Sequence, residues 1–405
     1  MSSGSFFAAS TKDSTISSAL RSISFSLSAI QTPLDIMLGI RKVWVSERAS
    51  NLKLGRPIFH RDDLKKLAKF WEKLPDKKVH CTLCSWRCVI ASGKVGVCHA
   101  RKNEDGELYS LVYGSIVSWM DDPIEKKPFY HFWPGSKAFS IAAPGCNFKC
   151  LHCQNWTISQ ASVGEVSYED ITPEQAIEMT KRYNCKGIAH TYTEPTIWTE
   201  YAIDVGKLAH REGLYNVYVS NGYITLEALQ ELRPYLDGAN VDVKAFTDAF
   251  YRKICGVAGI RPVLDTCEWM VEHGIHLEVT YLVIPHENDS AEEIRKFCKW
   301  VVEKLGPEVP THFSRFYPHY KMTDCDATPV RTLERALEIA KEEGIHYVYI
   351  GNVPGHAGDN TYCPKCGELL IERYGFDVVQ YRLKDHRCPK CHAEINIVGE
   401  YTLAD

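Results

Sequence analysis

The sequence predicts an α/β protein whose core is built from parallel βα repeats, with a cysteine-rich module on each side. Between residue 137 and about residue 350, short apolar runs alternate with amphipathic helical patterns, which is typical of parallel βα units. Before this region four cysteines fall close together, and after it come two Cys-x2-Cys pairs. The 405 residues are 45% hydrophobic, enough for one large domain with smaller modules.

Composition excludes several broad classes of function. A net charge of -4 does not favour general attraction to nucleic acid or to membrane surfaces. We find no run of about 18 apolar residues, so we expect no membrane contact. Most of the sixteen cysteines lie in tight clusters, as in metal sites of a reducing compartment. We therefore expect a cytoplasmic protein.

The first 55 residues are serine-rich and weakly patterned. They lack the basic start and continuous apolar stretch of a secretory signal. We expect either a disordered tail or a start codon assigned too early, with Met37 or a later codon as the true start. The apolar spacing in residues 61–74 predicts an amphipathic helix.

Residues 56–136 form the predicted N-terminal module. Its four cysteines have the spacing of a closed four-ligand metal site: Cys81, Cys84, Cys88 and Cys98. Zinc and an auxiliary [4Fe-4S] cluster both accept four thiolates, and we favour zinc. Residues 108–119 predict one or two strands. Residues 122–135 contain three prolines, so we expect an extended, non-helical segment that either lines a site or acts as a rigid connector.

Residues 137–351 form the predicted core. The expected strands are residues 137–143, 187–193, 215–220, 239–244, 276–284 and 312–317, with a further strand at 346–350. Between them we expect helices at residues 172–183, 225–232, 289–305 and 331–343. A helix after the second strand should end near residue 212, and one or two helices should lie between the fourth strand and residue 273. Thr172, Pro173 and Gln175 form a well-defined helix start.

The loop after the first core strand carries the strongest chemical signal. It places Cys146, Cys150 and Cys153 in a Cys-x3-Cys-x2-Cys spacing. A structural zinc ion or an electron-transfer [4Fe-4S] cluster needs four protein ligands, so three cysteines leave one iron open for chemistry. The alternative is a zinc knuckle that borrows a fourth ligand such as Cys185.

Residues 352–405 predict a zinc ribbon. Two Cys-Pro-Lys-Cys knuckles supply four ligands: Cys363, Cys366, Cys388 and Cys391. The expected role is structural, because so small a module holds little core of its own. A ribbon with basic residues between and beside its knuckles could instead grip nucleic acid or a protein partner.

The Cys146-x3-Cys150-x2-Cys153 motif after a first strand resembles the signature of the radical S-adenosylmethionine (SAM) superfamily. Together with the segments Tyr192-Thr193-Glu194-Pro195 and Ile350-Gly351-Asn352, residues 60–400 resemble the AmmeMemoRadiSam-system radical SAM enzymes, relatives of pyruvate formate-lyase activating enzymes. The resemblance implies a partial (βα)6 TIM-like barrel and a [4Fe-4S] cluster whose open iron binds SAM. It also implies reductive cleavage of SAM to a 5'-deoxyadenosyl radical, which abstracts hydrogen from an unidentified protein, RNA or small molecule.

The same resemblance implies partners and cofactor-binding residues. The partners are an external one-electron reductant of the flavodoxin or ferredoxin type and a Memo-like protein. Glu194 corresponds to the carboxylate that accepts the amino group of SAM, while Tyr192 and Thr193 replace two glycines of that motif. His152 stands where the superfamily usually has a carbocyclic aromatic residue. The other residues expected to contact SAM are Asn155, Ser220, Asn221, Asp242, Lys244 and His319.

Two alternatives to this Memo-linked enzyme follow from the sequence. The first is an activase of glycyl-radical enzymes, which would act on a partner with a suitable glycine loop. The second is a non-catalytic protein that binds metal and nucleic acid through its ribbon.

Overall fold

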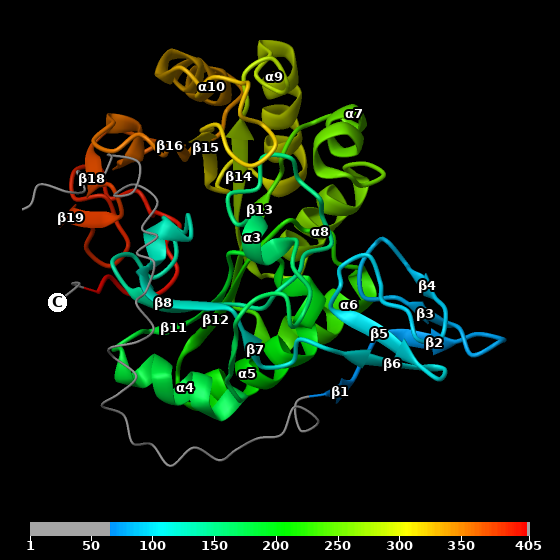
Figure 1. The fold of residues 1–405 in the computed structure, drawn as a ribbon. Helices are drawn as coiled ribbons and strands as arrows, with labels where there is room; N and C mark the ends of the chain where they lie inside the picture. The colour runs from blue at the N-terminus through cyan, green and yellow to red at the C-terminus, as the bar shows by residue number, and fades with distance from the viewer. Residues whose placement is uncertain (1–64, 403–405) are drawn as a thin grey trace, which may run out of the picture. The chain divides into compact units, whose positions relative to one another are not determined.

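A mostly parallel sheet of eight strands forms the centre of the structure, a computed structural model that describes residues 65–402. The strand order is β16-β15-β14-β13-β12-β11-β9-β8, and only the edge strand β8 runs antiparallel to its neighbour (Figure 1). The strands are β8 (Ser118–Pro123), β9 (Lys137–Ala142), β11 (Gly187–His190), β12 (Tyr215–Ser220), β13 (Gly238–Asp242), β14 (His276–Val283), β15 (Thr311–Arg315) and β16 (Val348–Gly351). Strands β8 and β16 are the two edges of this open sheet. The curvature of this sheet into a partial (βα)6 barrel therefore stays a prediction.

Helices follow the strands along the chain and pack against the sheet. They are α3 (Trp156–Ser159), α4 (Pro173–Arg182), α5 (Thr199–Arg211), α6 (Leu226–Leu232), α7 (Asp248–Phe250), α8 (Arg261–Glu272), α9 (Ala291–Trp300) and α10 (Val330–Glu342). Single turns of other helix types extend several of them: η4 (Pro195–Trp198), η5 (Arg233–Tyr235), η6 (Tyr251–Cys255) and η7 (Val301–Leu305). The predicted start of α4 is confirmed, because Thr172 and Gln175 form a reciprocal capping box.

The helix expected at 61–74 is wrong wherever the structure describes it, from residue 65 onward. This stretch instead forms β1 (Lys66–Leu67) and β2 (Trp71–Lys73). Strand β1 pairs with β6 (Glu107–Ser110), and β2 pairs with β3 (Val79–Cys81). Tertiary pairing thus overrides a helical spacing of apolar residues. The predicted N-terminal extension, residues 1–55, lies outside the described residues.

The N-terminal cysteine module is a set of short hairpins packed on the core. It also contains β4 (Val89–Ile90), β5 (Arg101–Glu104) and β7 (Ser115–Ile116), which pairs with β10 (Glu169–Asp170). Its buried residues Val79, Leu83 and Ile90 belong to the same hydrophobic cluster as the central strands. The module therefore stabilises, and is stabilised by, the sheet it covers.

The C-terminal ribbon packs on the segment between β8 and β9. The ribbon contains β17 (Thr361–Tyr362), β18 (Leu369–Tyr374) and β19 (Asp377–Tyr381), preceded by η8 (Ala357–Asp359). Arg373 donates to the carbonyl of Tyr130 at 2.9 Å and lies 4.0 Å from the carboxylate of Glu125, with both charged side chains fully buried. This segment therefore contacts the ribbon, and through Lys127 it also contacts the ring of Tyr192 on the loop after β11. The expectation of a wholly non-helical segment is wrong at η3 (Ile124–Lys126), because one 3-10 turn tolerates Pro123 just before it.

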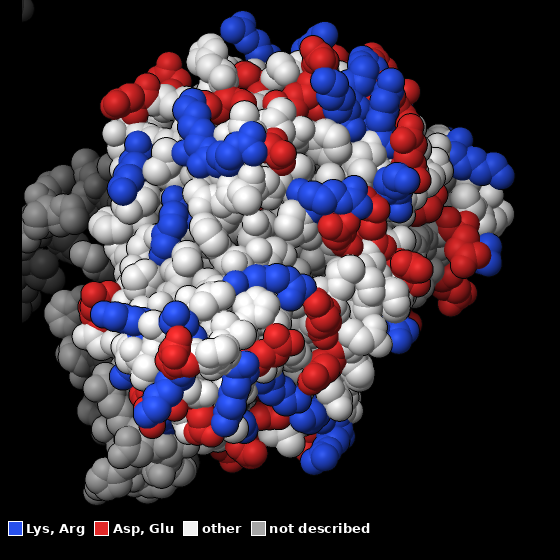
Figure 2. Space-filling model, turned by 90° about the vertical axis from the view of Figure 1, so that its right-hand side faces the viewer, with Lys and Arg blue, Asp and Glu red and all other residues white. Residues whose placement is uncertain are grey.

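Surface charge is mixed on the face shown in Figure 2, where Lys and Arg alternate with Asp and Glu around an uncharged central area. The basic residues of the ribbon are partly neutralised as well: Lys390 lies 3.5 Å from Glu368, and Arg387 lies 3.2 Å from Glu394. Within residues 65–402, no helix has both the length and the apolar character needed to cross a membrane.

Candidate active site

The predicted site residues gather where the parallel strands end. Cys146, Cys150 and Cys153 lie on the loop that follows β9, and Glu194 follows β11. The other strand-end residues are Ser220 and Asn221 at β12, Asp242 and Lys244 at β13, and His319 after β15. The carboxyl edge of a parallel sheet is where such folds bind ligands. Cys185, two residues before β11 begins, lies at the opposite end of that strand and is no fourth ligand for the loop.

The cysteine loop is held in place by backbone hydrogen bonds to neighbouring segments. The amides of Lys149 and Leu151 donate to the carbonyls of Cys255 and Ile254, each at 2.9 Å. The carbonyl of Leu151 in turn accepts from the amide of Lys321 at 3.0 Å. Segments that follow β13 and β15 therefore fix the path of the loop.

Cys146 and Cys153 are partly accessible and have polar neighbours. The amide of Phe148 donates to Cys146 Sγ at 3.3 Å, and Cys153 Sγ lies 3.2 Å from Ser159 Oγ. Burial, with the charge of Glu194, raises the pKa of the Cys146 thiol well above its ordinary value. A bound iron would have to displace this proton, because the thiolate is the ligand form.

Cys150 is buried beside two groups that favour its thiolate. A hydrogen bond from the Cys255 thiol lowers the pKa of Cys150, and the Lys244 ammonium acts in the same direction. Lys244 Nζ also donates to Asp242 Oδ2 at 2.8 Å. Burial alone would lower the pKa of Lys244. The charges of Asp242, Cys150 and Cys255 outweigh burial and raise this pKa well above its ordinary value. Lys244 therefore stays protonated, and its ammonium lies near the loop as part of an ion pair with Asp242.

Glu194 joins the loop after β11 to the loop after β12. Its Oε1 accepts from Thr196 N at 3.0 Å, Thr196 Oγ1 at 2.6 Å and Ser220 Oγ at 2.8 Å. Among residues 65–402, only Asn221 N donates to its Oε2, at 2.8 Å. Burial raises the pKa of Glu194, while these donors oppose the shift. A carboxylate oxygen accepts about two hydrogen bonds, so Oε2 keeps one position for a cationic ligand.

Tyr192 is a site residue whose structural role the sequence did not reveal. Its φ is 64°, in the left-handed region that favours glycine, which explains why the resembled motif has a glycine here. Its hydroxyl donates to Asp122, and Lys127 Nζ lies 4.1 Å from the centre of its ring. Its carbonyl accepts from Asn155 Nδ2 at 2.7 Å. These contacts hold a strained backbone and tie the cysteine loop to β8.

His319 and His152 have different surroundings. His319 Nε2 is 3.1 Å from the carbonyl of Gln154, and Tyr320 stacks on Trp156 with ring centres 4.9 Å apart. His152 is buried, which together with the charge of Lys244 lowers its pKa to about 3. His152 is therefore a neutral ring packed beside the cysteines.

The three groups of clustered cysteines differ in how closely their sulfurs approach. In the ribbon, Cys363 and Cys391 are 3.5 Å apart and Cys366 and Cys388 are 3.6 Å apart, with all four sulfurs within 4.8 Å of one another. Four thiolates around one ion at about 2.3 Å are about 3.8 Å apart, so this group can hold a single metal ion. Among residues 65–402 it is the only group of three or more metal-binding side chains that meets this limit. Cys146, Cys150 and Cys153 do not form such a group.

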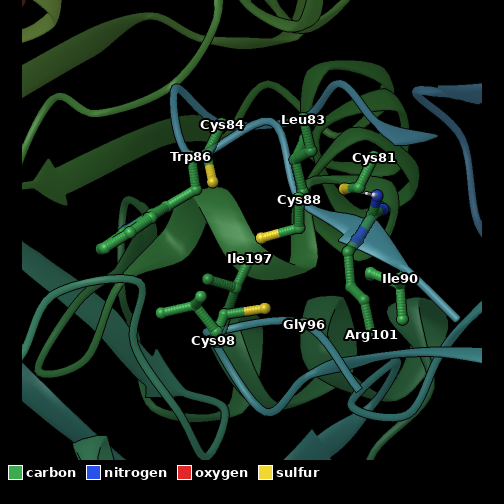
Figure 3. Close-up of a pocket in the computed structure, with 11 residues that line it drawn as sticks. Cys81, Leu83, Cys84, Trp86, Cys88, Ile90, Gly96, Cys98, Arg101 and Ile197 are labelled. Atoms are coloured by element: carbon green, nitrogen blue, oxygen red, sulfur yellow. Dashed lines mark hydrogen bonds between the residues drawn. The ribbon is translucent and has the colours of Figure 1, made fainter. Parts of the chain in front are cut away.

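The N-terminal cysteines are also brought together. Cys81, Cys84, Cys88 and Cys98 line one pocket, with their sulfur atoms directed into it (Figure 3). The four predicted ligands thus share one pocket, and metal binding there stays a prediction.

Comparison with known proteins identifies the class to which this fold and site belong. The family model of the radical SAM superfamily matches residues 140–298, which include all three loop cysteines and Glu194. An uncharacterised protein of Methanocaldococcus jannaschii is 48% identical over 333 residues, covering 82% of this chain and 99% of its own length. The chain belongs to the radical SAM superfamily, whose members are enzymes with SAM and a [4Fe-4S] cluster.

Within that superfamily, the chain is related to activating enzymes. The pyruvate formate-lyase-activating enzyme of Clostridium pasteurianum is 23% identical over 215 residues, covering 49% of this chain and 87% of its own. A solved domain of the pyruvate-formate lyase-activating enzyme from Bacteroides vulgatus is 14% identical with a TM-score of 0.37, covering 41% of this chain and 99% of its own.

Proposed function

We propose that this chain is a radical SAM enzyme that uses Cys146, Cys150 and Cys153 to hold a [4Fe-4S] cluster with one open iron. The supporting observation is the placement of three unpaired thiols at the carboxyl edge of the sheet, beside Glu194 and the Asp242–Lys244 pair. When bound, the cluster and SAM supply one-electron cleavage of SAM and abstraction of hydrogen from a substrate.

The residues of the chain bind and orient the cofactor. The free acceptor position on Glu194 Oε2 suits the ammonium of SAM, and Lys244 suits its carboxylate. Asn155, Ser220, Asn221 and His319 line the same edge and would contact the remainder of SAM. The buried rings around the loop exclude water, which protects a reactive intermediate from side reactions.

Formation of 5'-deoxyadenosine tests this proposal. Anaerobically reconstituted protein is mixed with SAM and a one-electron reductant, either dithionite or a flavodoxin, and the product is measured by mass spectrometry. Cys150→Ala should abolish the product. Cys298→Ala is a matched control, because Cys298 is also a buried cysteine but lies in α9. Equal product from wild-type protein and Cys150→Ala would contradict the proposal.

The substrate class needs a separate experiment. We propose a protein, RNA or small-molecule substrate in a Memo-linked system, with a flavodoxin- or ferredoxin-type reductant. Transfer of deuterium into 5'-deoxyadenosine from labelled candidates, including a Memo-like protein, would identify it. The cytoplasm is our proposed compartment, since all sixteen cysteines are free thiols in the structure.

The relationship to a pyruvate formate-lyase-activating enzyme supports activation of a glycyl-radical enzyme as a second candidate. A glycyl radical signal on a co-expressed partner would favour it, and persistent absence of that signal would count against it. The third hypothesis, a non-catalytic nucleic-acid-binding module, loses support because Arg373 is buried and other basic residues of the ribbon pair with acids. We propose zinc as the structural metal of the ribbon.

A further inference from the structure

The pocket of the N-terminal module has four cysteine ligands and an apolar lining. Cys81 ends β3, and Cys84, Cys88 and Cys98 lie on the turns around β4 and before β5. Figure 3 shows the four sulfurs directed into one space from different sides. The remaining lining is mostly apolar: Leu83, Trp86, Ile90, Gly96, Val97 and Ile197. A shell of this kind limits the access of water to a bound metal group.

The spacing of the sulfurs argues against a single ion in this pocket. A single zinc ion needs four thiolates about 3.8 Å apart. The four cysteines of the ribbon have that spacing, with sulfur pairs at 3.5 and 3.6 Å. The N-terminal quartet, whose residues are all described, is not among the groups of side chains close enough to hold one ion. A [4Fe-4S] cluster places each thiolate on a different iron and therefore requires the wider arrangement.

Two direct contacts connect the pocket to the loop that carries the catalytic cysteines. Trp86 Nε1 donates to the carbonyl of Asn147 at 2.7 Å. Gly145, with a φ of 100°, lies so near the pocket that a Cβ on it would stand 2.6 Å from the carbonyl oxygen of Cys98. The residues on both sides of Cys146 thus touch residues of the quartet module.

Arg101 adds a charge to one side of the pocket. Its Nη1 donates to Cys81 Sγ at 3.6 Å, and its Nη2 pairs with the buried carboxylate of Glu200. Hydrogen bonds to ligating sulfurs are among the features that set the reduction potential of an iron-sulfur cluster. This contact suits a group that changes its charge during function.

We propose that Cys81, Cys84, Cys88 and Cys98 bind a second [4Fe-4S] cluster, which passes electrons to the cluster on Cys146, Cys150 and Cys153. With four thiolates this cluster has no open iron, so it binds neither SAM nor substrate. It accepts one electron from a flavodoxin- or ferredoxin-type reductant and gives that electron to the neighbouring cluster, with no bond made or broken. The expectation of zinc at this site is replaced by this proposal.

The test uses a full-length variant in which Cys146, Cys150 and Cys153 are all changed to Ala. After anaerobic reconstitution with iron and sulfide, wild-type protein should contain about eight irons and the triple variant about four irons and four sulfides, as one [4Fe-4S] cluster requires. Absence of iron from the triple variant would overturn the proposal. Circular dichroism checks that the variant is folded.

Wild-type protein provides a second measurement if the triple variant does not fold. Two clusters in wild-type protein predict about eight irons, whereas one cluster predicts about four. The EPR signal of fully reduced protein should be broadened by interaction between two neighbouring clusters. A count of about four irons with an unbroadened signal would overturn the proposal. Protein with eight irons that never cleaves SAM would instead contradict the proposed function and leave the second cluster intact.

Discussion

Replacing Glu194 by Gln separates two roles that the structure gives to this carboxylate. Glu194 accepts four hydrogen bonds that join two loops, and it keeps one acceptor position on Oε2. A Gln side chain preserves most bonds when its oxygen occupies the Oε1 position. Its amide group then faces the amide of Asn221, so one hydrogen bond is lost and a buried donor has no acceptor.

The expected loss of stability is modest. A hydrogen bond to a charged group is worth about 1.5–3 kcal/mol, and removal of the buried charge of Glu194 offsets part of this loss. We therefore expect the free energy of unfolding to fall by about 2 kcal/mol. With an unfolding entropy of about 2.1 cal/mol/K per residue, this lowers Tm by roughly 2 °C for a chain of this size.

The expected loss of SAM affinity is much larger. The Gln amide cannot accept from an ammonium, and truncating one partner of a buried charge pair costs about 2–5 kcal/mol. That range corresponds to an increase in Kd of about 30-fold or more. Equilibrium dialysis of SAM against anaerobically reconstituted protein measures it directly.

Thr196→Val is the matched control for this experiment. It removes the Thr196 Oγ1 hydrogen bond to Oε1, so it should lower Tm by a similar amount, but it leaves Oε2 and its charge in place. SAM affinity should be nearly unchanged. If Glu194→Gln binds SAM as tightly as wild-type protein does, Glu194 only joins the two loops and our reasoning about its free position is wrong.

Three further predictions concern groups around the site and the ribbon. Lys244→Met should lower the midpoint potential of the cluster in an EPR-monitored titration, because it removes a positive charge beside Cys150, whereas the exposed Lys253→Met should not. Burial raises the pKa of Glu125 to about 7, so its protonation stabilises the folded chain at low pH and this stabilisation is lost as pH rises through 7. From pH 5 to pH 8, the free energy of unfolding of the wild-type protein should therefore fall by on the order of 3 kcal/mol more than that of Glu125→Gln, as measured by thermal unfolding. The same pH dependence of stability in both proteins would refute this. Cys391→Ser should reduce bound zinc by about one ion and lower Tm, while cleavage of SAM at low temperature persists; retention of full zinc would contradict the metal assignment.

The core strands could be predicted because their sequence patterns are local. Strand β12 has the predicted bounds, and the capping box is formed by Thr172 and Gln175, which are three positions apart in the sequence. The helix expected at 61–74 failed because the pairing of β1 with β6 joins residues about forty positions apart. A local apolar spacing carries no information about such distant partners.

The ligands of the candidate site could be predicted from the sequence, whereas the contacts that hold these ligands in place could not. Three cysteines close in sequence must lie close in space, so the loop was evident. The contact between Cys150 and Cys255, and the three contacts of Tyr192, depend on how different strand ends meet. The cysteine spacing alone also could not distinguish one ion from a cluster in the N-terminal module, because that distinction depends on distances between sulfurs.

The anchoring of the cysteine loop is made by backbone groups. The amides of Lys149 and Leu151 donate to Cys255 and Ile254, and the carbonyl of Leu151 accepts from Lys321. Replacing a cysteine side chain leaves these backbone bonds in place, so a variant that cannot bind iron should still keep the path of the loop. Loss of iron and loss of the fold are therefore separate outcomes for the cysteine variants proposed above.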